Sequence, residues 1–351
     1  MKAFAVNKGG SITAPDGDLI FMDFDRFRSE VFTIGHCFVC GRARCKDFNR
    51  EHIIPDWMLR LCGLHNKEIT LPNGVRTRYS TYRLRCCTKC NSRLGDEFER
   101  PIREVISAGF DRVEEYANSG GAELLQLWMA LIFLKVHLRD RRVPVHRDQR
   151  LGSETVGEEY DLDLLHHVHA LARARLFGIE VDPDVFGTFV IMRAHREWCP
   201  TTFNYADNYL GGTIMIRVKD VVLYSVIADC GLVGSMMGPQ LDSLTNRMLD
   251  IQYLEVLTRL ACANVHIISQ PQFRTGIDLL SGGSKIEVKL PDKAEIRDLD
   301  RDVLGWMMEG TVSRFVSESV GANLRTGHST TLWDANGDTV EYPKPNIDPE
   351  W

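Results

Sequence analysis

Hydrophobic residues recur every three or four positions in five stretches of the chain, the spacing that places them on one face of a helix. We expect helices over 96–117, 122–138, 161–177, 241–262 and 300–318. The second of these is apolar on every side, so it should lie in the core. Its longest apolar run, Leu124–Val136, has 13 residues and is interrupted by Gln126 and Lys135. Because a membrane span needs about 20 apolar residues, we expect no span.

Stretches rich in β-branched residues and bounded by Gly or Asp predict strands. They lie at 188–192, 213–218, 221–227, 265–269 and 286–290. Lys219-Asp220 and Asn336-Gly337 have the composition of tight hairpin turns, and short extended pieces are expected within 1–36. This mixture of helices and antiparallel strands predicts an α+β fold. At about 150 residues per domain the length predicts two domains, which we place at 1–118 and 119–342, followed by a loose tail at 343–351.

Charge is distributed unevenly along a chain whose composition, 44% hydrophobic and 26% charged, is ordinary for a globular protein. Between Arg42 and Glu104, 14 Lys and Arg residues stand against 8 Asp and Glu. This segment therefore carries +6, which leaves −12 on the rest of a chain whose net charge is −6. The function must therefore account for a basic module on an otherwise acidic chain. The net negative charge excludes a protein that coats nucleic acid with a uniformly basic surface.

The chain contains ten cysteines and begins without an apolar leader segment. We therefore expect a cytoplasmic protein whose cysteines serve metal binding or catalysis rather than disulfides. Two C-x-x-C pairs stand out, Cys37/Cys40 and Cys87/Cys90. Each pair places two thiolates at the spacing that grips one side of a tetrahedral ion, and two pairs complete a four-cysteine zinc site.

The alternative for these four cysteines is two unrelated buried pairs. Gly41 directly after the first pair suits the tight turn that such a pair needs. Cys86 lacks the C-x-x-C spacing to Cys90, and Cys45 and Cys62 are expected to be core thiols.

Between the cysteine pairs, Glu51-His52 precedes Ile53-Ile54-Pro55 and reads as the end of a strand, while Asn91 begins a helix. Successive strand side chains point to opposite sides, so Glu51 and His52 reach one centre only if the strand bends. A neutral histidine can take a proton from water near neutral pH. Carboxylate and amide oxygens suit a hard divalent cation, whereas thiolates select zinc, so two metals in one module are chemically coherent.

Together, Cys37-x-x-Cys40, Glu51-His52-Ile53-Ile54-Pro55 and Cys87-x-x-Cys90-Asn91-x-x-x-Gly95 resemble the HNH endonuclease superfamily, whose core is the ββα-metal fold. The resemblance covers about 37–100. It implies a small zinc-bound ββα-metal nuclease module beside a larger mixed helix and antiparallel-strand domain. It also implies that His52 is the general base, that Glu51 and Asn91 hold a catalytic Mg²⁺ or Mn²⁺, and that Zn²⁺ is structural.

The sequence departs from the family at one position. The middle Asn of the family, which braces the catalytic His through its backbone, is replaced by Tyr82, and Ser80, Asn73 and Asn66 are open as substitutes. Basic side chains are expected to line the phosphate path, although they could equally well only solvate an exposed ribbon. These are Arg76, Arg78, Arg83, Arg85 and Arg93.

Two further patterns carry weaker signals. His166, His167 and His169 lie within a helical run where their spacing does not converge on one ion, so we expect packing histidines. Asp278 followed by Glu287 and Lys289 resembles the PD-(D/E)xK nuclease pattern, for which an ordinary exposed strand is the stronger interpretation.

The sequence therefore predicts a metal-dependent HNH-type endonuclease that hydrolyses phosphodiester bonds of nucleic acid, DNA preferred. By analogy with stand-alone nucleases, a role in bacterial anti-phage defence is expected. The domain after residue 118 would serve recognition or regulation, through a homodimer or a regulatory partner. The alternative is a non-catalytic zinc-binding adaptor that binds DNA or protein.

Overall fold

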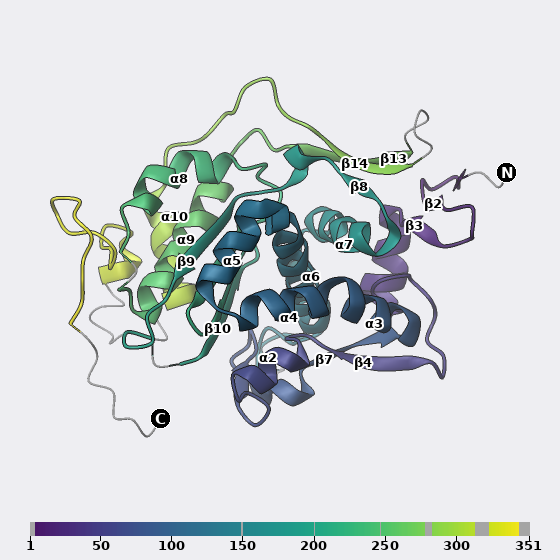
Figure 1. The fold of residues 1–351 in the computed structure, drawn as a ribbon, viewed down its shortest axis with the longest axis horizontal. Coiled ribbons are helices and arrows are strands. Elements are labelled where there is room, and N and C mark those ends of the chain that lie inside the picture. Colours follow the sequence, from purple (N-terminus) through teal and green to yellow (C-terminus); the bar gives the residue numbers. More distant parts are fainter. Residues whose placement is uncertain are drawn as a thin grey trace. The chain divides into compact units, whose positions relative to one another are not determined.

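The computed structural model describes residues 4–148, 150–199, 201–245, 247–277, 283–312 and 323–343. The chain divides into two compact units (Figure 1). Unit 1 comprises Met1–Ser107, Glu123–Val185 and Phe273–Val288, and unit 2 comprises Ala108–Ala122, Phe186–Gln272 and Lys289–Trp351. The chain forms helices and antiparallel sheets, which confirms the predicted α+β class. The domain boundaries proposed after residues 118 and 342 stay predictions.

Two antiparallel strands and a helix form the part of unit 1 that carries the cysteines. Strand β4 (Phe48–His52) pairs with β7 (Arg83–Cys87), in a register that sets His52 opposite Arg83 and Phe48 opposite Cys87. Helix α3 (Thr88–Leu94) follows β7 directly and packs against both strands. It continues through a π-helix, η3 (Gly95–Glu99), into α4 (Arg100–Ser107). The chain between β4 and β7 forms α2 (Asp56–Leu61), the hairpin β5 (Glu68–Thr70) and β6 (Arg76–Arg78), and the short 3-10 helix η2 (Tyr79–Thr81).

Two long helices supply the core of unit 1. Helix α6 (Ala122–Asp140) is buried along almost its whole length, which its uniformly apolar sequence predicts. Helix α7 (Leu162–Phe177) begins where the Asp161 side chain accepts hydrogen bonds from the backbone of Asp163 and Leu164, and it ends at Gly178 with a φ of 64°. Both termini follow the usual capping chemistry, an N-terminal Asp and a C-terminal glycine.

Short elements complete unit 1. A three-stranded sheet of β1 (Ala5–Val6), β2 (Ile12–Thr13) and β3 (Leu19–Phe21) precedes α1 (Phe24–Arg26) and the π-helix η1 (Phe27–Ile34). A second sheet has the order β13-β14-β8. Its members and the nearby short helices are β8 (Glu180–Val181), β13 (Gln272–Ile277), β14 (Ser284–Lys289), η5 (Val156–Glu159) and η6 (Pro183–Val185).

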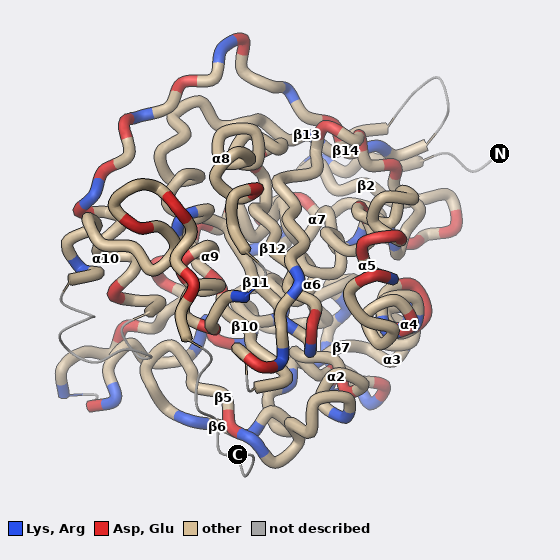
Figure 2. The backbone as a smooth tube through the Cα atoms, turned by 60° about the vertical axis from the view of Figure 1, so that its left-hand side comes forward, with Lys and Arg blue, Asp and Glu red and all other residues tan. Residues whose placement is uncertain are grey.

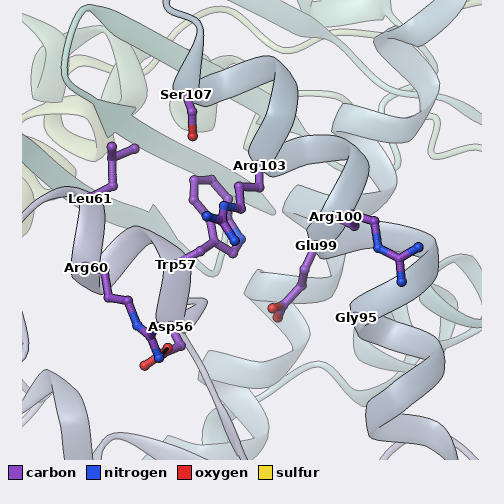
Figure 3. A pocket seen from close by; sticks show the side chains of 9 residues that line it. All are labelled: Asp56, Trp57, Arg60, Leu61, Gly95, Glu99, Arg100, Arg103 and Ser107. Carbon is purple, nitrogen blue, oxygen red and sulfur yellow. Dashed lines mark ion pairs between the residues drawn. The ribbon is translucent and has the colours of Figure 1, made fainter.

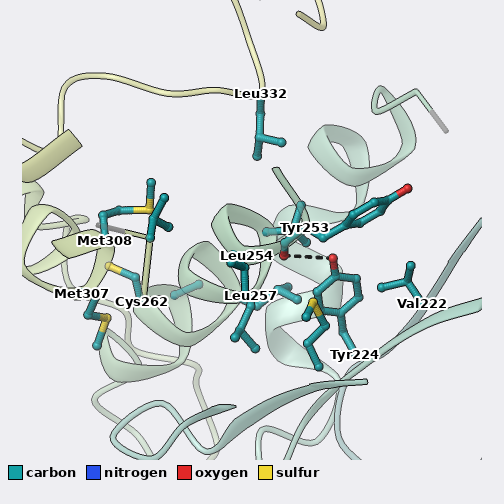
Figure 4. Packing of buried hydrophobic residues seen from close by; sticks show 14 of the residues in the cluster. Val222, Tyr224, Tyr253, Leu254, Leu257, Cys262, Met307, Met308 and Leu332 are labelled. Atoms are coloured by element: carbon teal, nitrogen blue, oxygen red, sulfur yellow. Dashed lines mark hydrogen bonds between the residues drawn. The ribbon is translucent and has the colours of Figure 1, made fainter. Parts of the chain in front are cut away.

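Unit 2 is a four-stranded antiparallel sheet packed against a helix. The strand order is β10-β11-β12-β9, and every residue of the two central strands is buried. Helix α9 packs on three of these strands, and the Tyr224 hydroxyl donates to the Tyr253 carbonyl across that interface (Figure 4). The elements are α5 (Phe110–Tyr116), η4 (Ala117–Gly121), β9 (Phe189–Arg193), β10 (Phe203–Asn208), β11 (Thr213–Val218), β12 (Val221–Val226), α8 (Leu232–Asp242), α9 (Asp250–Val265) and α10 (Arg301–Val312).

Several predicted elements are corrected by the structure. The helix expected over 96–117 breaks at Gly109, whose φ of 93° no regular helix accepts. The helix expected over 241–262 is two helices, α8 and α9. The strand expected at 265–269 is wrong, since Val265 ends α9, His266 caps it, and only an isolated bridge between Ile267 and Ile296 follows. Strand β10, which has no β-branched run, was not predicted.

One helix, Phe110–Asp140, is long and apolar enough to cross a membrane. Yet 83% of its most apolar window is buried inside the protein, which is the pattern of a core helix. No second helix of this kind occurs in the described ranges.

We expect Gly41→Ala to lower the free energy of unfolding more than Gly63→Ala does. Both glycines have positive φ, 71° and 65°, so either alanine costs about 1 kcal/mol in backbone strain. At Gly41 the new Cβ would also lie 2.5 Å from Met22 Cε and 2.8 Å from Glu30 Oε2, whereas at Gly63 nothing lies within 4 Å. Both neighbours are the ends of flexible side chains that must move, which should add roughly 0.5 kcal/mol. Denaturant unfolding measures both, and equal losses would refute the crowding.

Candidate functional site

The four cysteines predicted to bind zinc come together in unit 1. The sulfurs of Cys37, Cys40, Cys87 and Cys90 all lie within 4.8 Å of one another, with Cys87 at 3.7 Å from Cys37 and 3.8 Å from Cys40. A Zn–S bond of about 2.3 Å in a tetrahedral site sets sulfurs about 3.8 Å apart. The cluster therefore has the dimensions of a structural zinc site, and its donor set of four thiols is the one that selects zinc.

The charges around this cluster favour a bound cation. Hydrogen bonds from the Cys40, Cys86 and Cys90 thiols lower the pKa of Cys37, while the same contacts with Cys37 raise the pKa of Cys40 and Cys90. The thiols therefore favour the charged form at Cys37 and oppose it at Cys40 and Cys90, whereas a divalent ion would favour the thiolate at each position.

A buried arginine donates hydrogen bonds to the backbone of the first cysteine pair. Arg173 of α7 is 1% exposed and donates to the Val39 carbonyl, between Cys37 and Cys40, as well as to the carbonyls of Leu19 and Ile20. Burial lowers its pKa to about 10, and the nearby thiols oppose this shift, so the guanidinium stays charged at neutral pH. Its positive charge offsets part of the negative charge of a four-thiolate zinc site.

The remaining cysteines near the cluster do not join it. Cys86 is buried with its sulfur 3.7 Å from that of Cys37, but the group of four contains Cys87 instead, as the spacing predicted. Cys45 is exposed and Cys62 is half-buried. The expectation that Cys45 is a core thiol is therefore wrong, because its segment, 42–47, runs along the surface before β4.

Glu51 and His52 leave opposite faces of β4, as alternation requires. The Glu51 side chain is buried, and its Oε1 accepts a hydrogen bond of 2.9 Å from Lys135 Nζ of α6. The imidazole of His52 is 17% exposed, on the face that carries Arg83 opposite it. Burial lowers the pKa of His52, and the Arg83 guanidinium adds to this, so the ring is neutral at neutral pH.

Asp56 lies beside His52, at the start of α2. Its Oδ1 is 3.9 Å from His52 Nε2, 3.0 Å from His65 Nε2, and its Oδ2 is 2.6 Å from Arg60. Burial tends to raise the pKa of Asp56, but the hydrogen bond with His65 and the charge of Arg60 outweigh it, and the pKa lies below its ordinary value. A carboxylate is thus held charged within reach of the imidazole.

Asn91 lies on α3, the helix that packs against β4 and β7. Its Oδ1 is buried and accepts no hydrogen bond within the described part of the chain. A buried amide oxygen without a donor is costly, and a hard cation is one group that would satisfy it. The predicted metal ligands therefore include one orphaned acceptor, Asn91, and one carboxylate already shared with an ammonium group, Glu51.

A cavity of about 620 Å³ is lined by residues of α2 on one side and of η3 and α4 on the other (Figure 3). Asp56, the neighbour of His52, lines it from α2, and Glu99 lines it from the end of η3. Burial raises the pKa of Glu99 to about 7, Lys135 opposes this shift, and a hydrogen bond with Glu51 adds to it. The cavity is thus lined by one neighbour of His52 and by one hydrogen-bond partner of Glu51, while Glu51, His52 and Asn91 are not among its lining residues. The other lining residues are Trp57, Arg60, Leu61, Gly95, Arg100, Arg103 and Ser107.

The arginines predicted to line a phosphate path lie in different surroundings. Arg76, Arg78 and Arg85 are exposed on β6 and β7 (Figure 2). Arg83 Nε donates to the Ser80 carbonyl at 2.7 Å. Arg93 is engaged elsewhere, 3.3 Å from Asp18 and over the ring of Phe177. Their contact with nucleic acid stays a prediction, and none of the five lines the cavity.

Which residue takes the bracing role of the family's middle Asn stays a prediction, although the backbone carbonyl of Tyr82 accepts a hydrogen bond of 3.2 Å from the amide of Ile53, next to His52. The Tyr82 hydroxyl donates to Asp140 at 2.8 Å, the Asn73 side chain accepts from the backbone of Val75, and the Ser80 carbonyl accepts from Arg83. The backbone carbonyl of His52 instead accepts a hydrogen bond of 2.8 Å from Lys135.

The weaker candidates behave as packing or surface residues. His166, His167 and His169 pack against Phe27 or Phe273, and burial lowers the pKa of His167 to about 3. They form no metal-like group within the described residues, which confirms the packing interpretation. Glu287 is exposed on β14, and Asp278 lies outside the described residues.

Comparison with known proteins adds no family assignment. No protein-family model, curated protein or solved structure matches the chain.

Sequence reasoning missed the functional candidates that the fold brings in from elsewhere. Asp56 stands four residues after His52, a spacing that a helix start after Pro55 brings within reach, so a local signal existed. No local sequence pattern indicates that Glu99 and the arginines Arg60, Arg100 and Arg103 line one cavity. Lys135 had a signal, since a lone lysine in an apolar helix requires a buried partner.

We expect purified protein to contain about one zinc ion per chain, and Cys87→Ala to lose it. Cys86→Ala, which removes an equally buried thiol next to it, should keep the metal, because Cys86 is outside the tetrahedral group. Elemental analysis measures both. Retention of zinc by Cys87→Ala together with its loss from Cys86→Ala would contradict the ligand assignment.

Proposed function

We propose that unit 1 is a metal-dependent nuclease of the HNH type, with His52 as the general base and Glu51 and Asn91 as ligands of a divalent cation. The observation that carries the proposal is that Asp56, 3.9 Å from His52, and Glu99, which is hydrogen-bonded to Glu51, line one cavity together with three arginines. The four-cysteine cluster that could bind zinc supports it, since that cluster holds β7 and α3 to the chain before β4.

His52 takes the proton from the attacking water. In the neutral ring the proton lies on Nε2, which faces Asp56 at 3.9 Å. Nδ1 is then free to accept the proton that the attacking water gives up. Asp56 then stabilises the imidazolium, because a carboxylate next to a charged ring lowers the energy of that charge. The lowered pKa of His52 keeps the ring unprotonated, and ready to accept, at neutral pH.

Glu51 and Asn91 have the donor atoms that Mg²⁺ or Mn²⁺ prefers, a carboxylate and an amide oxygen. When bound, such an ion neutralises charge on the phosphate and on the leaving oxygen. The unpaired Oδ1 of Asn91 fits this role. Glu51 would share its carboxylate between the ion and Lys135.

The cavity arginines are placed to bind the phosphates of the substrate. Arg60 and Arg100 are engaged by Asp56 and Asp96, while Arg103 is exposed and takes part in no ion pair within the described residues. Arg103 is therefore the guanidinium most available to a phosphate. Arg76, Arg78 and Arg85 would extend the contact along the exposed strands.

The resemblance to the HNH superfamily favours DNA over RNA and products with a 5′-phosphate. For unit 2 we propose a role in recognition or regulation. We further propose that the protein acts in the cytoplasm and, by analogy with stand-alone nucleases, in bacterial defence. These assignments go beyond unit 1 and rest on the resemblance alone.

We expect His52→Ala to lower the rate of Mg²⁺- or Mn²⁺-dependent plasmid cleavage by 10²- to 10⁴-fold, the usual contribution of a general base. His195→Ala, a histidine of unit 2, is the matched control and should cleave like wild type. Agarose gels with both ions measure the rates. Equal cleavage by His52→Ala would remove the assigned base, and a wild type inactive with either ion would favour the adaptor.

We expect Arg103→Ala to weaken DNA binding several-fold while leaving the rate at saturating DNA nearly unchanged. The slope of log affinity against log salt concentration should fall by about 1, since one phosphate contact is lost. Arg112→Ala is the control, because Arg112 pairs with Glu115 on α5 and is not among the residues that line the cavity. Fluorescence anisotropy at several salt concentrations measures the slopes, and an unchanged slope for Arg103→Ala would count against the cavity as the phosphate site.

A further inference from the structure

Lys135 is an unusual residue at its position. It lies in the middle of α6, between Leu134 and Val136, and is 1% exposed. Burying an ammonium group costs several kcal/mol unless it is paired and hydrogen-bonded. An apolar side chain would fill the same space in this helix without that cost. A lysine here therefore calls for a reason beyond packing.

The contacts of Lys135 converge on two consecutive residues of the candidate active site. Nζ donates to Glu51 Oε1 at 2.9 Å and to the backbone carbonyl of His52 at 2.8 Å. One nitrogen thus holds the carboxylate of the first residue and the peptide oxygen of the second. The first hydrogen bond fixes the direction of the Glu51 side chain. The second fixes the plane of the peptide between His52 and Ile53.

We infer that Lys135 is a positioning residue that sets the relative orientation of Glu51 and His52, an inference that rests on the proposed nuclease function. The two side chains leave opposite faces of β4, so the strand itself does not aim them at one centre. His52 is also the last residue of the strand, and the peptide that follows it is held on two sides. The Ile53 amide donates to the Tyr82 carbonyl at 3.2 Å, and Lys135 fixes the carbonyl side of the same peptide at 2.8 Å.

The second hydrogen bond separates this role from that of an ordinary buried ion pair. Neutralising Glu51 would require the 2.9 Å contact alone. The contact with the His52 carbonyl adds nothing to charge balance, but it ties α6 to the peptide that carries the base. Removal of Lys135 should therefore disturb the chemical step more than it disturbs substrate binding.

The test compares three variants in the full-length, zinc-loaded protein. Lys135→Met should lower kcat for cleavage of a labelled DNA duplex by about 100-fold, the effect of a misplacement near 1 Å. Its affinity for DNA, its zinc content and the salt dependence of binding should stay near wild type. Lys135→Arg keeps the charge, but its longer side chain and planar guanidinium cannot occupy the position of the lysine Nζ without shifting the two acceptors, so it should recover only part of the rate. Gln126→Met, which removes another buried polar side chain from α6, is the matched control and should cleave like wild type.

A second measurement does not depend on activity. In protein labelled with ¹⁵N-histidine, the ring signals of His52 should shift in Lys135→Met and stay in place in Gln126→Met. If Lys135→Met does not fold, Lys135→Arg carries the same comparison.

The outcomes distinguish the inference from the proposed function. Full activity in a folded Lys135→Met, or unmoved His52 signals, would overturn the positioning role and leave the nuclease standing. Higher activity and tighter Mg²⁺ binding in Lys135→Met would show that the ammonium competes with the ion, which also overturns it. An inactive wild type would end the nuclease proposal, and the His52 signals alone would then decide whether Lys135 orients the ring.

Discussion

The geometry of the candidate site depends on four sulfur atoms that come from two short segments about fifty residues apart in the chain. These sulfurs lie within 4.8 Å of one another, at the separations that one tetrahedral zinc ion sets. Strand β7 leads into the second pair and α3 begins there, so a bound ion would fix the end of the strand and the start of the helix. Strands of five residues and a helix of seven are too small to form a core alone, and a metal at this cluster would add to their stability.

Two buried cations complete this arrangement, one at each end of the β4–β7 pair. Arg173 sits behind the cysteines and holds the backbone between Cys37 and Cys40. Lys135 sits behind Glu51 and holds the backbone of His52. Each is 1% exposed and donates to main-chain carbonyls. Burying each charge costs free energy, and the hydrogen bonds that offset this cost also fix a segment of backbone, the loop at Val39 for Arg173 and the end of β4 for Lys135. The side chains of the long helices α6 and α7 thereby hold backbone that lies more than eighty residues earlier in the chain.

The parts predicted from sequence are those whose signal is local. The C-x-x-C spacing identified the four sulfurs, the uniformly apolar run identified α6, and β-branched residues identified β11 and β12. The parts that were missed depend on distant segments meeting. Glu99 is one acid among several on an amphipathic stretch, and only the fold sets it against Glu51. Tyr82 stood where a brace was expected, yet its hydroxyl reaches Asp140, while Lys135 had been read only as an interruption of an apolar run.

The central claim is that Glu51 and Asn91 share one hard cation beside His52, and anomalous scattering from Mn²⁺-soaked crystals tests it directly. The account predicts two metal positions in unit 1. One is zinc among the four cysteines, and the other is manganese about 2.1–2.2 Å from Asn91 Oδ1 and from a carboxylate oxygen of Glu51. A manganese peak elsewhere, with Asn91 Oδ1 still without a partner and Glu51 bound only to Lys135, would contradict it.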